Sequence, residues 1–308
     1  MQTATAAAST ATGAAHPVAV ERLTKRYGDV TAVDDLSFTV RWGAVTGFLG
    51  ANGAGKSTTL KVVLGLAAPT SGRATVMGRP YHQLPQPARS VGAVLETGVF
   101  HPLRSGRAHL RVLAAAAGID DSAVDAALER VGLAAAADRR VGGYSLGMRQ
   151  RLGLASALLG DPRVLVLDEP ANGLDPEGIR WLRGLLRDFA AGGGAVLVSS
   201  HLLAEVEALA DDDVVVHRGR LVRQAPVTEL TATAVAVDSP AAARLAAVLA
   251  AEGLRVRRDG ATRLVVDGAS AARVGDAACA AGLPIHGLAP LRTRLEEAFF
   301  AMTEQESR

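Results

Sequence analysis

The sequence predicts an α/β fold followed by a smaller α+β domain, and two features of the hydrophobic pattern indicate this. Short apolar runs at 164–167 and 195–198 are typical of buried strands in a parallel sheet, and helical patterns lie between such runs. Beyond about residue 226 the expected elements change to the order β-α-β-β-α-β. The predicted division of the 308 residues is a tail at 1–16, a first domain at 17–226 and a C-terminal domain at 227–308.

Several elements of the first domain follow from local patterns. Residues 36–42 alternate apolar and polar side chains like a half-buried strand, and the run 44–49 leads into a glycine-rich segment. A helical stretch follows at 58–66. Residues from about 103 to 159 have helical periodicity without comparable strands, so we expect a helical subdomain, at about 97–160, inserted into the α/β core.

The expected elements of the C-terminal domain follow the split β-α-β order of a ferredoxin-like domain. They are strands at 234–237, 254–257, 264–266 and 285–288, helices at 240–251 and 271–281, a hairpin turn at 259–260 and a last amphipathic helix at 293–302. Both domain helices end in Gly-Leu, at Gly253 and Gly282, which is typical of a glycine helix stop and gives a weak internal repeat.

Composition limits the classes of function. A formal net charge of +2 argues against a large nucleic-acid-binding surface. Residues 1–16 have neither a basic nor a leucine-rich segment, and no window has the roughly 20 apolar residues of a membrane span, so we expect any membrane crossing to belong to another chain. A single cysteine excludes an internal disulfide. Cys279 lies in an alanine-rich helical stretch and is interpreted as a buried thiol.

A phosphate-binding loop is predicted by the segment GANGAGKST, which follows a strand and precedes a helix. Its glycines let successive backbone N–H groups surround phosphate oxygens, Lys56 can reach the β- and γ-phosphates, and the Ser57 hydroxyl can ligate Mg²⁺. The candidate nucleotide contacts here are Gly50, Asn52, Gly53, Ala54, Gly55, Lys56, Ser57 and Thr58. The alternative is a glycine-rich turn that binds nothing.

A pair of carboxylates, Asp168 and Glu169, ends the apolar run 164–167. The first can hold Mg²⁺, and the second can orient or deprotonate an attacking water. The alternative, that two acids merely end a strand, loses weight beside the phosphate loop.

Four further segments distinguish among phosphate-loop proteins. The segment 144–151, YSLGMRQR, resembles the signature motif of ABC-transporter ATPases. Gly173-Leu174-Asp175 looks like their D-loop, His201 after a strand looks like their switch histidine, and Tyr27 matches the aromatic residue that stacks on adenine. The resemblance covers about residues 18–224.

The resemblance implies a phosphate-loop NTPase core with an antiparallel β subdomain and a helical subdomain. It implies that Ser145 and Gly147 face the γ-phosphate bound by a second subunit, so that two chains enclose two ATP molecules, and it places Asp175 beside the nucleotide. Simpler interpretations remain open: Tyr27 can be a surface turn residue, His201 a helix cap, and Ser145 the N-cap of the helix that follows it.

The sequence departs from the family pattern at three positions. Leu146 and Met148 replace a Gly and a Gln of the usual signature, and Glu96 replaces the Gln that joins the Mg²⁺ site to the membrane subunit. Together with the C-terminal segment 295–300, these features resemble the bacitracin-export, lantibiotic-immunity and multidrug-export branch. Glu96 is a further candidate metal ligand, which can either strengthen Mg²⁺ binding or slow hydrolysis.

The resemblance thus implies an ATP hydrolase that uses ATP and Mg²⁺ and powers a separate transmembrane permease. We expect a pair of ATPase subunits, identical or related, on the cytoplasmic face of the membrane, without nucleic acid, exporting an antibiotic-like or lipid-like compound. A soluble ABC ATPase acting on DNA or the ribosome is the alternative, and a small-molecule kinase is a third possibility that has no use for Ser145 or His201. The C-terminal domain is expected to regulate or to dimerise.

Overall fold

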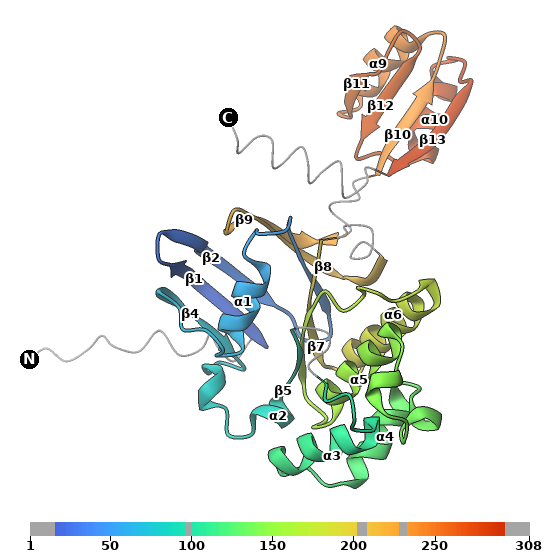
Figure 1. Cartoon of the computed structure of the whole chain (residues 1–308). Helices are drawn as coiled ribbons and strands as arrows, with labels where there is room; N and C mark the ends of the chain where they lie inside the picture. Colours follow the sequence, from blue (N-terminus) through green and yellow to red (C-terminus); the bar gives the residue numbers. More distant parts are fainter. Residues whose placement is uncertain (1–15, 96–99, 202–207, 228–232, 293–308) are drawn as a thin grey trace, which may run out of the picture. The chain divides into compact units, whose positions relative to one another are not determined.

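The computed structural model describes residues 16–95, 100–201, 208–227 and 233–292. The chain forms two compact units, Met1–Ala225 and Pro226–Arg308, and each is described here by itself. Figure 1 shows their elements. Within the described residues, no helix combines the length and the apolar character needed to cross a bilayer.

The first unit is built on a six-stranded sheet with the order β5-β6-β7-β3-β8-β9. Its strands are β3 (Val45–Leu49), β5 (Val91–Val94), β6 (Val164–Asp168), β7 (Ala195–Ser200), β8 (Asp212–His217) and β9 (Arg220–Pro226). From β5 to β8, neighbouring strands are parallel. The strands β6 and β7 lie between β5 and β3, so β6 and β7 are central and buried.

Both faces of this sheet are buried, because alternate residues of each strand enter different hydrophobic cores. In β6, Leu165 and Leu167 pack with the helices that follow β5, whereas Val164 and Val166 pack with the first strands of the chain. Val196 and Leu197 divide between the same two cores in β7. Two-sided burial explains why these strands are continuous apolar runs in the sequence.

A three-stranded antiparallel sheet, with the order β2-β1-β4, packs on the second of these cores. Its strands are β1 (Val18–Tyr27), β2 (Val30–Val40) and β4 (Ser71–Val76). Helix α1 (Lys56–Val63) lies beside it, as Figure 1 shows in blue. This arrangement confirms the antiparallel β subdomain that the family resemblance implied.

The helices between β5 and β6 pack on one another and on the first core, and Figure 1 shows them in green. They are α3 (Gly106–Ala117), α4 (Ser122–Arg130) and α5 (Leu146–Leu158). Two further helices among the described residues of the unit are α2 (Pro87–Ser90) and α6 (Pro176–Ala191), and single 3₁₀ turns lie at Tyr81–Gln83, Ala134–Ala136 and Val141–Gly143. Ser105 caps α3, since its hydroxyl accepts a hydrogen bond from the Ala108 N–H at 3.2 Å.

Two glycines allow the end of α5 to rest directly on the backbone of α2 and β5. A Cβ atom at Gly92 in β5 would lie 2.0 Å from the Ala157 carbonyl oxygen, and one at Gly160 would lie 2.0 Å from the Ala88 carbonyl oxygen. Backbone oxygens cannot move aside as a flexible side chain can. Glycine is therefore required at both positions for this contact between backbones.

The second unit has the element order β-α-β-β-α-β and a four-stranded antiparallel sheet with the order β11-β12-β10-β13. Its elements are β10 (Thr233–Asp238), α9 (Ala242–Ala251), β11 (Arg255–Arg258), β12 (Arg263–Asp267), α10 (Ala271–Ala280) and β13 (Gly287–Arg292). Val235, Val266 and Leu245 belong to its hydrophobic core. This order is the ferredoxin-like one that the sequence predicts.

The two helices in the described part of this unit, α9 and α10, end in the same glycine motif. Gly253 has φ +80° and donates to the Ala250 carbonyl, while the next N–H, of Leu254, donates to the Leu249 carbonyl. Gly282 and its successor repeat both bonds at the end of α10. The paired 6→1 and 5→2 hydrogen bonds define a Schellman motif, and they explain the Gly-Leu repeat in the sequence.

Two expectations for this unit are wrong. The last strand is not 285–288 but extends from Gly287 to Arg292 and includes Pro290, because β13 is an edge strand in which a missing N–H is tolerated. Cys279 is exposed. The buried positions of α10 are Val274, Ala277 and Ala278, so the next residue along the helix turns away from the core. The helix expected at 293–302 lies outside the described residues.

Candidate functional site

The glycine-rich loop connects the buried strand β3 to helix α1, and close packing holds it in place. A Cβ atom at Gly50 would lie 2.6 Å from the Val216 carbonyl oxygen. Gly55, the residue before α1, has φ +97°, and a Cβ atom there would lie 2.4 Å from the Ala32 carbonyl oxygen. The loop therefore needs glycine at both ends. The Gly55 conformation also directs the first N–H groups of α1 toward the loop interior, where an anion can bind.

Lys56 begins α1, and its side chain is only 6% exposed. Its ammonium group donates to the Gly50 carbonyl at 2.7 Å and to the Ala51 carbonyl at 3.4 Å. It also lies 3.5 Å from Oε1 of Glu169. A buried ammonium with these partners is held in the loop without a ligand, and phosphate oxygens can replace the carbonyl oxygens as its partners.

The carboxylate pair lies at the end of β6, next to β7 in the sheet. Asp168 is the last residue of β6 and accepts a hydrogen bond at Oδ1 from the hydroxyl of Ser199. Glu169 follows with φ +50°, a left-handed conformation that is unusual for a residue with a side chain. Its N–H donates to the Ser199 hydroxyl at 3.0 Å and to the Ser199 carbonyl at 3.2 Å.

His201 directly follows β7, and its Nδ1 lies 2.6 Å from Oε2 of Glu169. The Glu169 carboxylate thus has one oxygen near His201 and the other near Lys56. Three side chains from three different segments of the sequence meet at one edge of the sheet. In an open α/β sheet, the carboxyl ends of the strands are where ligands bind.

These residues line a cavity of about 490 Å³. The lining residues are Val30, Thr31, Ala32, Ala51, Asn52, Gly53, Gly55, Lys56, Ser57, Thr58, Glu169, Asn172 and His201. Of the other loop residues that the sequence singles out, Ala54 is buried and its carbonyl accepts from the Gly219 N–H. The volume falls within the range of small-molecule sites.

The side chain of Tyr27 is half exposed at the end of β1. Tyr27 pairs with Val30, which lines the cavity, so the ring lies near its rim. The Lys25 ammonium lies 4.6 Å from the ring centroid, a cation–π distance. The adenine-stacking role of Tyr27 stays a prediction.

Ser145 is exposed and caps α5, accepting a hydrogen bond at its hydroxyl from the Met148 N–H at 3.2 Å. Gly147 lies in the first turn of α5, where an added Cβ would have only an ordinary 3.6 Å contact with Leu174. Packing of the isolated chain therefore does not require glycine at this position. Asp175 caps α6 in the same way, with its Oδ1 2.7 Å from the Gly178 nitrogen.

Besides the lining residues Val30, Thr31, Ala32, Ala51 and Asn172, two polar residues that support the site were not identified from the sequence. One is Ser199, which contacts both members of the carboxylate pair. The other is Gln150 in α5, which is fully buried and donates through Nε2 to the Pro170 carbonyl at 2.7 Å, so it links α5 to the residue after Glu169. The sequence feature that could have identified both residues is a polar side chain inside an otherwise apolar strand or helix. Glu96 lies outside the described residues.

The residues present fit a magnesium ion that is held partly by phosphate. The described residues contain no group of three or more His, Cys, Asp or Glu side chains that could hold a metal. Mg²⁺ does not require such a group, because it is usually bound by one or two protein oxygens together with substrate phosphates and waters. Asp168, with no described donor to its Oδ2, and the exposed Ser57 hydroxyl are the candidate ligands.

Comparisons with known proteins identify the family of the chain. The ABC transporter family matches residues 33–172, and a domain of unknown function, DUF8746, matches residues 233–296. The bacitracin transport ATP-binding protein BcrA of Bacillus licheniformis is 42% identical over 211 residues, which cover 68% of this chain and 69% of that protein. The lantibiotic transport ATP-binding protein SrtF of Streptococcus pyogenes is 36% identical over 66% of this chain and 88% of its own length.

A solved ATP-binding subunit of an ABC transporter matches 69% of this chain and 91% of its own length, with 29% identity and a TM-score of 0.63. A dimeric ATP-binding cassette bound to ADP and phosphate has the same fold, with a TM-score of 0.62 at 20% identity over 68% of this chain and 98% of its own. The chain therefore belongs to the ATP-binding subunits of ABC transporters.

Proposed function

We propose that this ATPase works as one of two paired subunits and that hydrolysis drives export by a permease on a separate chain. The observation that supports catalysis most directly is the meeting of Lys56, Glu169 and His201 at the edge of the cavity. It brings a phosphate-binding cation beside a carboxylate that can activate water. Three other cavities formed by described residues are not lined by a lysine, a glutamate and a histidine together.

Each of these side chains has a distinct proposed role. Lys56 binds the β- and γ-phosphates, and Glu169 orients the attacking water and accepts its proton. His201 holds the Glu169 carboxylate through the 2.6 Å contact and adds a donor near the γ-phosphate. Ser57 and Asp168 would hold Mg²⁺, which when bound offsets negative charge on the phosphates.

The proposed pairing follows from the exposure of the signature segment. Ser145 and Leu146 are both exposed at the start of α5, where the helix N-terminus is a favourable site for an anion. ATP bound to a second subunit provides that anion. We therefore propose that two copies of this chain, or this chain and a related ATPase, enclose two ATP molecules.

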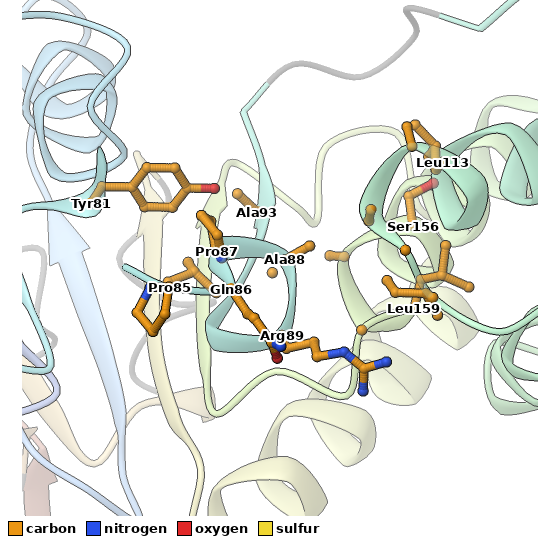
Figure 2. A pocket seen from close by; sticks show the side chains of 18 residues that line it. Tyr81, Pro85, Gln86, Pro87, Ala88, Arg89, Ala93, Leu113, Ser156 and Leu159 are labelled. Atoms are coloured by element: carbon orange, nitrogen blue, oxygen red, sulfur yellow. The ribbon is translucent and has the colours of Figure 1, made fainter. Parts of the chain in front are cut away.

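The proposed contact with the permease is a groove of about 1040 Å³ formed by α2, β5, α3 and α5. Figure 2 shows Tyr81 on one side of the segment 85–89, and Leu113, Ser156 and Leu159 on the other. Strand β5 forms part of its wall and ends two residues before Glu96, the position that the family pattern assigns to contact with the membrane subunit. A short cytoplasmic helix of the permease, apolar on one face, is the proposed occupant.

Cysteine cross-linking tests this contact, because Cys279 is the chain's only cysteine and can first be replaced by serine. Leu113→Cys is expected to cross-link to the permease in membranes. Val112→Cys is the matched control, since Val112 is exposed on the same helix but does not line the groove. Equal cross-linking of both variants, or none with Leu113→Cys, would exclude the groove as the permease contact.

The proposed cargo class comes from named relatives. BcrA is named for bacitracin transport and SrtF for lantibiotic transport. The Nod factor export ATP-binding protein I of Burkholderia orbicola is 40% identical over 68% of this chain and 70% of its own length. We propose an antibiotic-like or lipid-like compound as the cargo, with this subunit at the cytoplasmic face of the membrane.

Replacement of the loop lysine tests the catalytic site. Lys56→Ala is expected to abolish ATP hydrolysis by the assembled transporter, since it removes the only side-chain cation that the loop offers to the phosphates. Lys61→Ala, on the same helix, is the control and is expected to retain activity. Near wild-type hydrolysis by Lys56→Ala would show that this loop is not the catalytic one.

The C-terminal unit is proposed to regulate or to dimerise. All the candidate site residues lie before Gln224, and the unit has a hydrophobic core of its own. Truncation after Val227, which retains β9, should therefore preserve ATP binding while it changes turnover or subunit pairing. A folded truncated protein without nucleotide binding would refute this division of roles.

A further inference from the structure

Ser199 lies in the centre of the sheet at the level of the carboxylate pair. It is on β7, directly opposite Asp168 in the parallel register of β6 and β7, and none of its surface is exposed. Its neighbours within the strand, Val198 and Leu197, are apolar core residues. A hydroxyl at this depth requires hydrogen-bond partners.

Its hydroxyl uses both of its hydrogen-bonding functions on the carboxylate pair. The O–H donates to Oδ1 of Asp168, and the oxygen accepts the N–H of Glu169 at 3.0 Å. This contact holds the Asp168 carboxylate in one orientation. It also occupies Oδ1 and leaves Oδ2 as the oxygen that is available to a cation.

The second contact fixes the backbone of Glu169. The Glu169 N–H is shared between the hydroxyl and the carbonyl of Ser199, and the residue has φ +50°. Residues with a side chain disfavour this left-handed conformation, so surrounding contacts must maintain it. From this conformation the carboxylate reaches His201 at 2.6 Å.

We propose that Ser199 is a positioning residue that aligns both carboxylates, one for the metal and one for the attacking water. The proposal rests on the proposed roles of Asp168 and Glu169. A partner of this kind acts through the ligand it orients, and loss of such a partner typically weakens metal affinity or activity by about 10- to 100-fold. A serine with a merely structural role would change stability without changing metal affinity.

The test is Ser199→Ala in the full chain, purified with its permease. Titration of Mn²⁺ in the presence of ADP, followed by electron paramagnetic resonance, should give a metal dissociation constant raised by about 10- to 100-fold. The rate constant for ATP hydrolysis should fall by a similar factor, and metal-free ADP binding should be unchanged. A wild-type Mn²⁺ constant in Ser199→Ala would overturn the proposal.

Thr46→Ala is the matched control. Thr46 is also fully buried, on β3 of the same sheet, but its hydroxyl has no hydrogen-bond partner among the described residues. It should keep the wild-type Mn²⁺ constant, and an equal increase in both variants would refute a specific role for Ser199. If Ser199→Ala does not fold, Ser199→Cys, which has a similar shape but a weaker donor, must show the raised constant.

Glu169→Gln, measured in parallel, separates this proposal from the proposed catalytic function. If Glu169→Gln hydrolyses ATP slowly while Ser199→Ala keeps the wild-type Mn²⁺ dissociation constant and hydrolysis rate, only the positioning role is refuted. Wild-type hydrolysis by Glu169→Gln would refute the proposed base. A raised Mn²⁺ constant in Ser199→Ala would then still support the alignment of Asp168.

Discussion

Replacement of Glu169 by glutamine separates catalysis from binding, because the amide keeps the shape of the side chain but is a far weaker base. The amide oxygen can still accept a hydrogen bond from His201 at the observed 2.6 Å position. The 3.5 Å contact with Lys56 loses its charge, but the buried ammonium keeps its hydrogen bonds to the Gly50 and Ala51 carbonyls, so it is not left without partners. Stability and nucleotide affinity should therefore change little.

The rate should change much more. Loss of a general base typically slows a reaction by about 10²- to 10⁴-fold, or about 2.7 to 5.4 kcal/mol of activation free energy. Phosphate release by the assembled transporter measures this directly. Because hydrolysis is what would reopen the ATP-bound pair, Glu169→Gln should accumulate as a nucleotide-bound dimer on size-exclusion chromatography with ATP and Mg²⁺.

Two controls make the outcome specific. Addition of Ser145→Arg should prevent the dimer, because a long side chain would occupy the exposed start of α5, which is proposed to face the partner's ATP. Glu96 is a candidate substitute for the lost base, so Glu96→Gln is tested alone and with Glu169→Gln. The single variant should stay active, and the double variant should be no slower than Glu169→Gln. Normal hydrolysis by Glu169→Gln, or no dimer with ATP even beside the permease, would refute the reasoning.

Three further predictions concern stability. Gln150→Leu should lower the free energy of unfolding by about 1 to 3 kcal/mol in chemical denaturation, because the buried Pro170 carbonyl loses its donor. Gly253→Ala should lower the free energy of unfolding by about 1 kcal/mol, because φ is +80° there and the loss is not a clash: no described atom lies within 4 Å of the new Cβ. Gly275→Ala, inside α10, should raise the free energy of unfolding by a similar amount. Equal effects of the two substitutions would contradict the assigned conformations. Burial, and to a lesser extent the charge of Arg104, lowers the pKa of His109 below its usual 6.5. Just below pH 6.5 the unfolded chain therefore binds a proton at this residue that the folded chain does not, so the free energy of unfolding should fall as the pH drops. His109→Phe should reduce that loss between pH 7 and 5.5, and an unchanged pH dependence would exclude His109 as its source.

The parts of the site that the sequence predicts are those whose chemistry is local. The loop from Gly50 to Ser57 has its spacing, its strand and its helix within one continuous segment. The pair Asp168-Glu169 likewise ends a strand that is recognisable from its apolar run. Parallel strands have their carboxyl ends at the same edge of a sheet, and this rule is enough to place the carboxylate pair near Lys56.

The parts that sequence reasoning missed depend on register and on face. Ser199 lies opposite Asp168 because β6 and β7 pair in one particular register, which no residue pattern within either strand specifies. The same holds for Cys279, where an alanine-rich helix gives little contrast between its buried and exposed faces. The predicted strand 285–288 stopped short of Pro290, whereas β13 includes this residue; the edge position that tolerates proline is a property of the whole sheet.

The backbone contact at Gly92 and Gly160 also has a mechanical consequence. Helix α5 has 13 residues and is therefore about 20 Å long, with Ser145 before its first residue and Gly160 just beyond its last. At the far end, carbonyl oxygens of α2 and α5 lie where side chains would otherwise form a deformable layer. A displacement of the segment 85–89 in the groove cannot be absorbed by side-chain rotation there. Helix α5 would then move nearly as a rigid body, so that its N-terminal end at Ser145 shifts by a distance comparable to the shift of the segment 85–89.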